Sequence, residues 1–160
     1  MDMRTLQARA RVLSREEFAV ENPHLYLVVD PHFDESSIAF QTEEVKVGRK
    51  PVRLQPTELE VLPVSKAAGN PYPDRISIGR ARNCDLVLRY PSVSKLHAHF
   101  RKLENGALEL VDLGSQNGTM ANGRFLDVNQ SALVVAGDVL AFGATTAQLV
   151  NGGLLFDLFR

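Results

Sequence analysis

The chain has 160 residues, of which 44% are hydrophobic and 23% are charged, as is typical of a folded globular protein. No stretch approaches the roughly 18 apolar residues of a membrane-spanning helix, and residues 1–4 do not begin a signal peptide. Cys84 is the only cysteine, so no intrachain disulfide can form. We therefore expect a cytoplasmic protein with one domain, an additional segment and no membrane contact.

Charge is distributed unevenly along the chain, although the formal net charge is only −1. Residues 74–102 hold seven basic side chains against two acidic ones, a local excess of +5. Such a window attracts an anionic partner; the alternative is that lysines and arginines cover a solvated strand face. The window lacks the aromatic residues expected of a stacking platform for nucleic acid, so nucleic acid is not the expected partner.

Residues 1–57 predict an N-terminal extension. Apolar residues recur there at helical spacing: Met3, Leu6, Ala10 and Leu13. Residues 14–17 read as a capping box, so we expect one or two helices that end before Pro23. The apolar run 25–29 predicts a strand, and 38–40 and 45–47 are short strand candidates. No motif in this extension indicates a function.

From residue 58 onward, short apolar runs alternate with turn-forming residues. They predict strands at 59–64, 76–78, 86–88, 96–100, 108–113, 133–135, 139–142 and 148–150. This regular spacing indicates an all-β sandwich or barrel. Alternation along one strand predicts that Leu96, Ala98 and Phe100 face the core. Lys95, His97, His99 and Arg101 would then lie on the opposite face. Residues 153–160 predict a short C-terminal helix packed on the sandwich.

Four short motifs follow one another within 46 residues: Ile78-Gly79-Arg80, Ser94-Lys95-Leu96-His97, Ser115-Gln116-Asn117-Gly118-Thr119 and Asn122-Gly123. In this order and spacing they resemble the signature of the forkhead-associated (FHA) domain, a phosphothreonine-binding module. The resemblance covers residues 58–152 and implies an eleven-stranded β-sandwich of short antiparallel strands. It also implies an adaptor in intracellular signalling. Its partner would be a threonine-phosphorylated protein or peptide, the substrate of a serine/threonine kinase.

The resemblance also assigns a role to each motif residue. Arg80 and Ser94 would contact the phosphate, and Lys95 would support them. The physical chemistry fits, because arginine presents a planar fork of donors, serine donates from its hydroxyl and backbone N–H, and lysine adds a mobile charge. Asn117 would reach the main chain of the bound peptide, and Gln116 would line the same loop.

Three more positions are expected to brace the loops. Gly79 permits a close approach of the backbone, His97 ties neighbouring loops together by hydrogen bonds, and Asn122 supports the turn that it opens. His97 and His99, two residues apart, also form a candidate metal pair, but no cluster at metal-ligand spacing accompanies them. We therefore expect no metal and no cofactor.

Enzyme signatures are absent from the sequence. It has no P-loop, no Gly-x-Ser-x-Gly elbow, no His-Glu-x-x-His and no dinucleotide fingerprint, and Asp112, Asp127 and Asp138 read as turn residues. The alternative to a phosphothreonine adaptor is a phosphate-independent scaffold with the same fold. A further hypothesis is that phosphorylated Thr57 occupies such a pocket, its own or a neighbour's; otherwise Thr57 merely opens the first strand.

Overall fold

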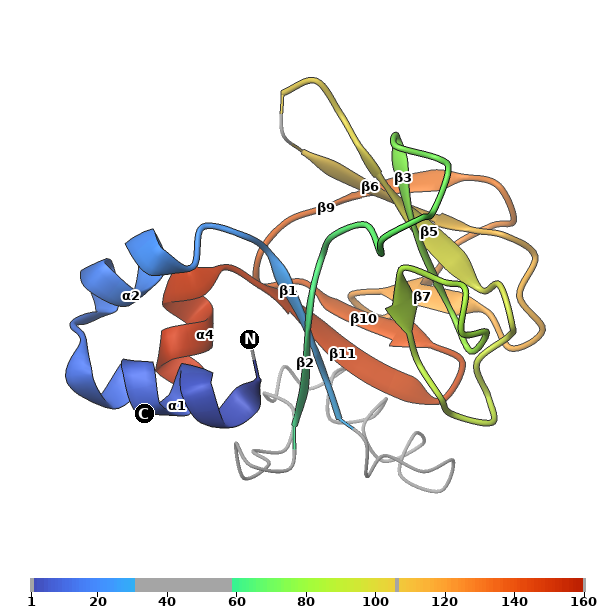
Figure 1. Ribbon diagram of the computed structural model, residues 1–160. Coiled ribbons are helices and arrows are strands. Elements are labelled where there is room, and N and C mark those ends of the chain that lie inside the picture. Colours follow the sequence, from blue (N-terminus) through green and yellow to red (C-terminus); the bar gives the residue numbers. More distant parts are fainter. Residues whose placement is uncertain (1, 31–58, 106, 160) are drawn as a thin grey trace.

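The computed structural model describes residues 2–30, 59–105 and 107–159. In this part of the chain, two sheets form a β-sandwich (Figure 1). The six-stranded sheet, ordered β2-β1-β11-β10-β7-β8, consists of Glu60–Pro63, Tyr26–Val29, Thr145–Val150, Val139–Phe142, Thr119–Ala121 and Arg124–Phe125. The five-stranded sheet, ordered β4-β3-β5-β6-β9, consists of Leu86–Val87, Arg75–Gly79, Ala98–Lys102, Leu108–Asp112 and Ser131–Val134. The predicted all-β sandwich is confirmed.

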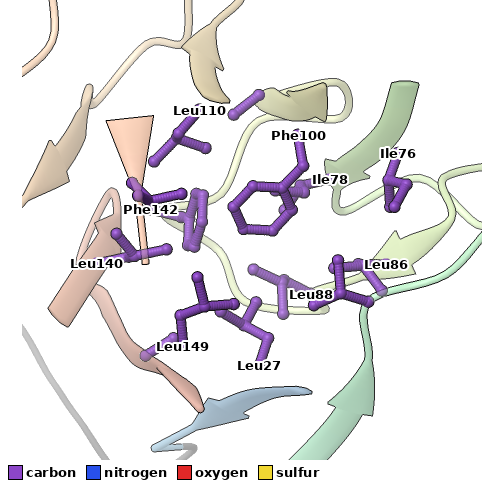
Figure 2. Packing of buried hydrophobic residues seen from close by; sticks show 14 of the residues in the cluster. Leu27, Ile76, Ile78, Leu86, Leu88, Phe100, Leu110, Leu140, Phe142 and Leu149 are labelled. Atoms are coloured by element: carbon purple, nitrogen blue, oxygen red, sulfur yellow. The ribbon is translucent and has the colours of Figure 1, made fainter. Parts of the chain in front are cut away.

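The inner faces of the two sheets enclose a hydrophobic core (Figure 2). Ile78, Phe100 and Leu110 come from the five-stranded sheet and are fully buried. Leu140 and Phe142 meet them from β10 of the other sheet and are equally buried. Burying a side chain of this size stabilises a fold by about 1.5–3 kcal/mol. The core therefore provides a rigid support for the loops that leave its strands.

Strand β1 is buried on both faces. Leu27 and Val29 point into the core between the sheets, whereas Tyr26 and Val28 belong to a second apolar cluster under the helices. This double burial explains why the run 25–29 is continuously apolar rather than alternating. β1 lies between β2 and β11 and pairs with both in antiparallel register. The sandwich thus includes a strand from residues 1–57, which differs from the expected division at residue 58.

Three helices cover the outer face of the six-stranded sheet near β1 and β11 (Figure 1). They are α1 (Met3–Val12), α2 (Arg15–Glu21) and α4 (Gly152–Leu158). The predicted capping box at Ser14 and Glu17 is present, and the predicted N-terminal and C-terminal helices are confirmed. Arg15 of α2 forms a two-bond ion pair with Asp157 of α4, with distances of 3.0 and 3.1 Å. No helix in the described residues could span a membrane.

The predicted alternation in 96–100 is wrong at its start. Strand β5 begins at Ala98, Leu96 is 54% exposed, and His97 is fully buried. His97 turns inward because its ring hydrogen-bonds two loops, as described below. Strands β7 and β8 were not predicted, since they are short and lack an apolar run. The candidates at 38–40 and 45–47, and Thr57, lie outside the described residues.

Candidate functional site

Three loops meet at one side of the sandwich, away from the helices (Figure 1). They follow β3, β4 and β6. β3 and β4 are parallel, with Ile78 opposite Leu86, so the loops that leave their carboxyl ends start at the same edge of the sheet. The backbone N–H of Arg80 donates to the carbonyl of Ser94 at 3.0 Å, and that of Ala81 donates to Lys95 at 3.1 Å. The first two loops are therefore bonded along their main chains.

Gly79 is the point of closest approach between those two loops. A Cβ atom added to Gly79 would lie 2.2 Å from the carbonyl oxygen of Lys95 and 3.0 Å from Cys84 Sγ. The obstacle at Lys95 is backbone, which cannot rotate away as a side chain can. Only glycine fits this position without displacing the loop that carries Ser94 and Lys95.

Arg80 projects from the end of β3 and is exposed. Its Nε atom donates a hydrogen bond to the carbonyl of Val93 at 3.0 Å, which fixes the plane of the guanidinium group. In the described part of the chain, its two terminal nitrogens have no hydrogen-bond or carboxylate partner. A planar fork of donors is thus held in place and remains available to an anion.

Ser94 is half-buried beside it. Its hydroxyl oxygen accepts a hydrogen bond from the backbone N–H of Gln116 at 3.0 Å, so the second and third loops are joined here. The Ser94 backbone N–H donates to Nδ1 of His97 at 3.1 Å. The expected double donation by Ser94 is therefore corrected: the backbone N–H is already used, and the hydroxyl proton is the donor that remains. The side chain of Lys95 is exposed next to it.

His97 connects the second loop to the third. Nδ1 accepts from Ser94, and Nε2 lies 2.9 Å from the carbonyl of Gly118. A carbonyl can only accept, so the ring is neutral with its proton on Nε2. Burial lowers the pKa of His97, and the hydrogen bond to Gly118 only partly opposes this. The ring also packs edge-on against Phe142, with centroids 5.7 Å apart, which anchors both loops to the core.

Asn117 is exposed on the third loop, before Gly118, whose φ of 86° requires a left-handed backbone. The side-chain Nδ2 of Asn117 donates to the carbonyl of Ser92 at 2.9 Å. The amide is therefore oriented, and Oδ1 is left as an acceptor. Ser92 also accepts a hydrogen bond from the N–H of Ala144 at 2.8 Å through its hydroxyl. The sequence analysis did not identify Ser92 as a site residue. The only feature that could have indicated it was its position two residues before Ser94.

Asp112 organises the third loop from its base. The carboxylate accepts hydrogen bonds from the backbone of Gly114 at 3.0 Å and from the hydroxyls of Ser115 at 2.5 Å and Thr119 at 2.7 Å. Burial by itself would raise the pKa of Asp112, but these hydrogen bonds outweigh it, and the pKa is lowered. Asp112 is the last residue of β6 rather than a turn residue, and its lowered pKa keeps the carboxylate ionised at neutral pH.

Two of the residues singled out in the sequence lie apart from this cluster. Asn122 is at the other end of β7, where it exchanges two hydrogen bonds with Val139 at 2.7 and 2.9 Å. It braces the β7–β8 turn rather than the loop of Asn117. His99 lies on β5, and its Nδ1 has no hydrogen-bond partner among the described residues. No cluster of three or more potential metal ligands occurs in the described residues.

The structure thus joins the loops that carry the expected binding residues Arg80, Ser94, Lys95, Gln116 and Asn117. Two further arginines, Arg82 and Arg89, lie beside Arg80. A solvent-open cavity of ≈ 430 Å³ is lined by Arg80, Arg82, Arg89, Tyr90 and Pro91. The sequence signal for Arg82 and Arg89 was the +5 window, but nothing in it distinguished them from a solvated strand face.

Comparisons with known proteins agree with this architecture. Residues 76–143 match the family model of the FHA domain. The glycogen accumulation regulator GarA of Mycolicibacterium smegmatis is 42% identical over 76 residues, which cover 48% of this chain and 46% of that protein. The DNA damage response protein kinase DUN1 of Saccharomyces cerevisiae is 34% identical over 80 residues, 46% of this chain and 15% of the kinase. In both, the chain spans less than half of the relative's length.

Solved FHA domains show the same fold. One, from a Chlamydia trachomatis protein, superimposes with a TM-score of 0.53 at 20% identity, covering 80% of this chain and 97% of that one. Another, from an Arabidopsis thaliana hypothetical protein, has a TM-score of 0.53 at 22% identity and covers 81% and 86%. The family match and the shared fold together show that residues 76–143 of this chain match the forkhead-associated (FHA) domain and that the sandwich has the FHA fold.

Proposed function

We propose that this chain is a phosphothreonine-binding adaptor that acts in the cytoplasm and captures substrates of a serine/threonine kinase. One observation carries the proposal. Arg80 presents a fixed guanidinium group with free terminal nitrogens, directly bonded through its backbone to the loop of Ser94, whose hydroxyl proton is also free. Donors of this kind, fixed on a rigid scaffold, suit a phosphate group.

A phosphate monoester at pH 7 carries a charge of about −1.5 to −2 and three acceptor oxygens. The terminal N–H groups of Arg80 and the hydroxyl of Ser94 would donate to these oxygens, and the ammonium group of Lys95 would add positive charge. All three are charge-assisted hydrogen bonds, which are roughly twice as strong as neutral ones. No bond is made or broken in this scheme, so the proposed activity is recognition rather than catalysis.

Asn117 would fix the direction of the peptide. Because its Nδ2 is occupied by the carbonyl of Ser92, Oδ1 would accept a backbone N–H of the ligand. Gln116 would line the same loop. A main-chain contact of this type is independent of the peptide's side chains, so the same site serves many phosphorylated sequences.

The loops need little ordering before a ligand binds. His97, Gly79 and Asp112 hold them through hydrogen bonds and close backbone contact. Ordering a flexible loop side chain costs about 0.5–1.5 kcal/mol, and here that cost is met during folding. This supports binding of a short peptide with few contacts.

The test is calorimetric titration of a degenerate phosphothreonine peptide library, with its unphosphorylated and phosphoserine counterparts. We expect a Kd in the micromolar range for phosphothreonine, or about −7 to −8 kcal/mol, and a Kd at least 100-fold weaker without phosphate. Phosphoserine lacks one methyl group, worth about 0.8 kcal/mol on burial, so its Kd should be about 4-fold weaker. Equal titration curves with and without phosphate would instead support a phosphate-independent scaffold.

A further inference from the structure

The cavity that Arg80 shares with Arg82 and Arg89 holds more positive charge than one phosphate group needs. Arg80 follows β3, Arg82 lies two residues further on, and Arg89 follows β4. The parallel pairing of β3 with β4 and the hydrogen bond from Leu88 N–H to the carbonyl of Gly79, 2.8 Å long, bring these segments together. Three arginines thus line one solvent-open cavity of ≈ 430 Å³.

These charges are uncompensated in the described part of the chain. None of its salt bridges involves Arg80, Arg82 or Arg89. Tyr90, which also lines the cavity, donates a hydrogen bond from its hydroxyl to the carboxylate of Glu60 at 2.6 Å. Like charges gathered at one place repel each other, and an anion that binds among them relieves this repulsion.

We propose that Arg82 and Arg89 form a subsite for a second anionic group on the same bound partner, next to the phosphothreonine held by Arg80. This inference rests on the proposed function. An extended peptide advances about 3.3 Å per residue, so a group two or three positions from the phosphothreonine lies about 7–10 Å from it. The second group would therefore be carried at one of these positions. A phosphoryl group and an acidic side chain share the chemistry that the subsite recognises, and the experiment separates them.

The experiment measures the affinity of four peptides by fluorescence anisotropy in 150 mM salt. The first carries one phosphothreonine, and the second carries an additional phosphothreonine two or three residues away. The third carries glutamate at that additional position, and the fourth carries only the additional phosphate. In the unaltered protein, we expect the doubly phosphorylated peptide to bind roughly 10-fold more tightly than the singly phosphorylated one, since each exposed ion pair contributes little. A comparable gain with glutamate would identify acidic side chains as sufficient.

Two double variants test which residues produce the gain in affinity from the second phosphate. Arg82→Ala/Arg89→Ala should bind the singly phosphorylated peptide within about 2-fold of the unaltered protein and lose the gain from the second group. Arg11→Ala/Lys102→Ala removes the same charge from exposed positions on α1 and at the far end of β5; it should keep the gain. The gain in the unaltered protein should also shrink as salt rises from 0.05 to 0.5 M, because exposed charges are screened.

Each contrary result has a distinct meaning. Equal affinity for the singly and doubly phosphorylated peptides in the unaltered protein overturns the second subsite and leaves the proposed function standing. If Arg82→Ala/Arg89→Ala weakens the singly phosphorylated peptide as much as Arg80→Ala does, the cavity is the phosphothreonine site itself and the inference is wrong. If no phosphorylated peptide binds, the proposed function and this inference fail together.

Discussion

Replacing Arg80 by alanine separates a binding role from a structural one. The change removes the two terminal nitrogens proposed to hold the phosphate. At about 1.5–3 kcal/mol for each hydrogen bond to a charged group, their loss amounts to at least about 3 kcal/mol. Since about 1.4 kcal/mol corresponds to tenfold in affinity, we expect the Kd for a phosphothreonine peptide to rise about 100-fold or more.

The same change should leave the fold nearly intact. Arg80 is exposed, and its loss removes one side-chain hydrogen bond, from Nε to the carbonyl of Val93. This hydrogen bond is partly buried and Val93 itself is buried, so its loss costs at least about 1 kcal/mol. In a domain of this size, 1 kcal/mol lowers Tm by about 2–4 °C.

Calorimetric titration checks the expected rise in Kd, and thermal melting of the same preparations checks the expected fall in Tm. Arg80→Lys is the matched control: it keeps the charge but loses the planar fork, so its affinity should fall between those of the unaltered protein and Arg80→Ala. A fall of Tm by more than about 10 °C would show that Arg80 is structural. An affinity within 3-fold of the unaltered protein would show that the phosphate binds elsewhere.

Three further outcomes are expected. Gly79→Ala should lower the free energy of unfolding by about 1–3 kcal/mol or more in urea titrations, because the new Cβ meets the Lys95 carbonyl; an unchanged midpoint would contradict this. Asp112→Asn should destabilise the fold by about 1.5–3 kcal/mol through its lost charge-assisted bonds, and equal stability would show that the carboxylate charge is dispensable. Stability should fall as pH drops below about 6.5, because His97 is buried neutral, its pKa is lowered, and the unfolded chain takes up the proton first. His97→Gln should flatten part of this slope in urea titrations at pH 5.5, 6.5 and 7.5, and should weaken phosphopeptide binding less than Arg80→Ala does; an unaltered slope would place the titration elsewhere.

Much of the fold is determined by local patterns in the sequence. Short apolar runs separated by turn residues predicted most strands of the sandwich, because a strand needs only a few residues with a buried face. The capping box at Ser14 and Glu17 predicted the start of α2, since it depends on residues three apart. The motifs around Gly79, Ser94 and Asn117 were sufficient to indicate the FHA family and the candidate binding residues, because their spacing is unusual in combination.

The tertiary structure decided what depends on contacts between distant segments. It placed β1 between β2 and β11. The sequence could not predict this pairing, because strands that pair across a long sequence separation leave no local signal. The tertiary structure turned His97 inward against the strand alternation, since a neutral ring can bond to both Ser94 and Gly118. It also gathered Arg82 and Arg89 beside Arg80 through the parallel pairing of β3 with β4. A charge count over residues 74–102 cannot distinguish a cavity lined by arginines from a solvated face, because charge at a site depends on where the chain folds back on itself.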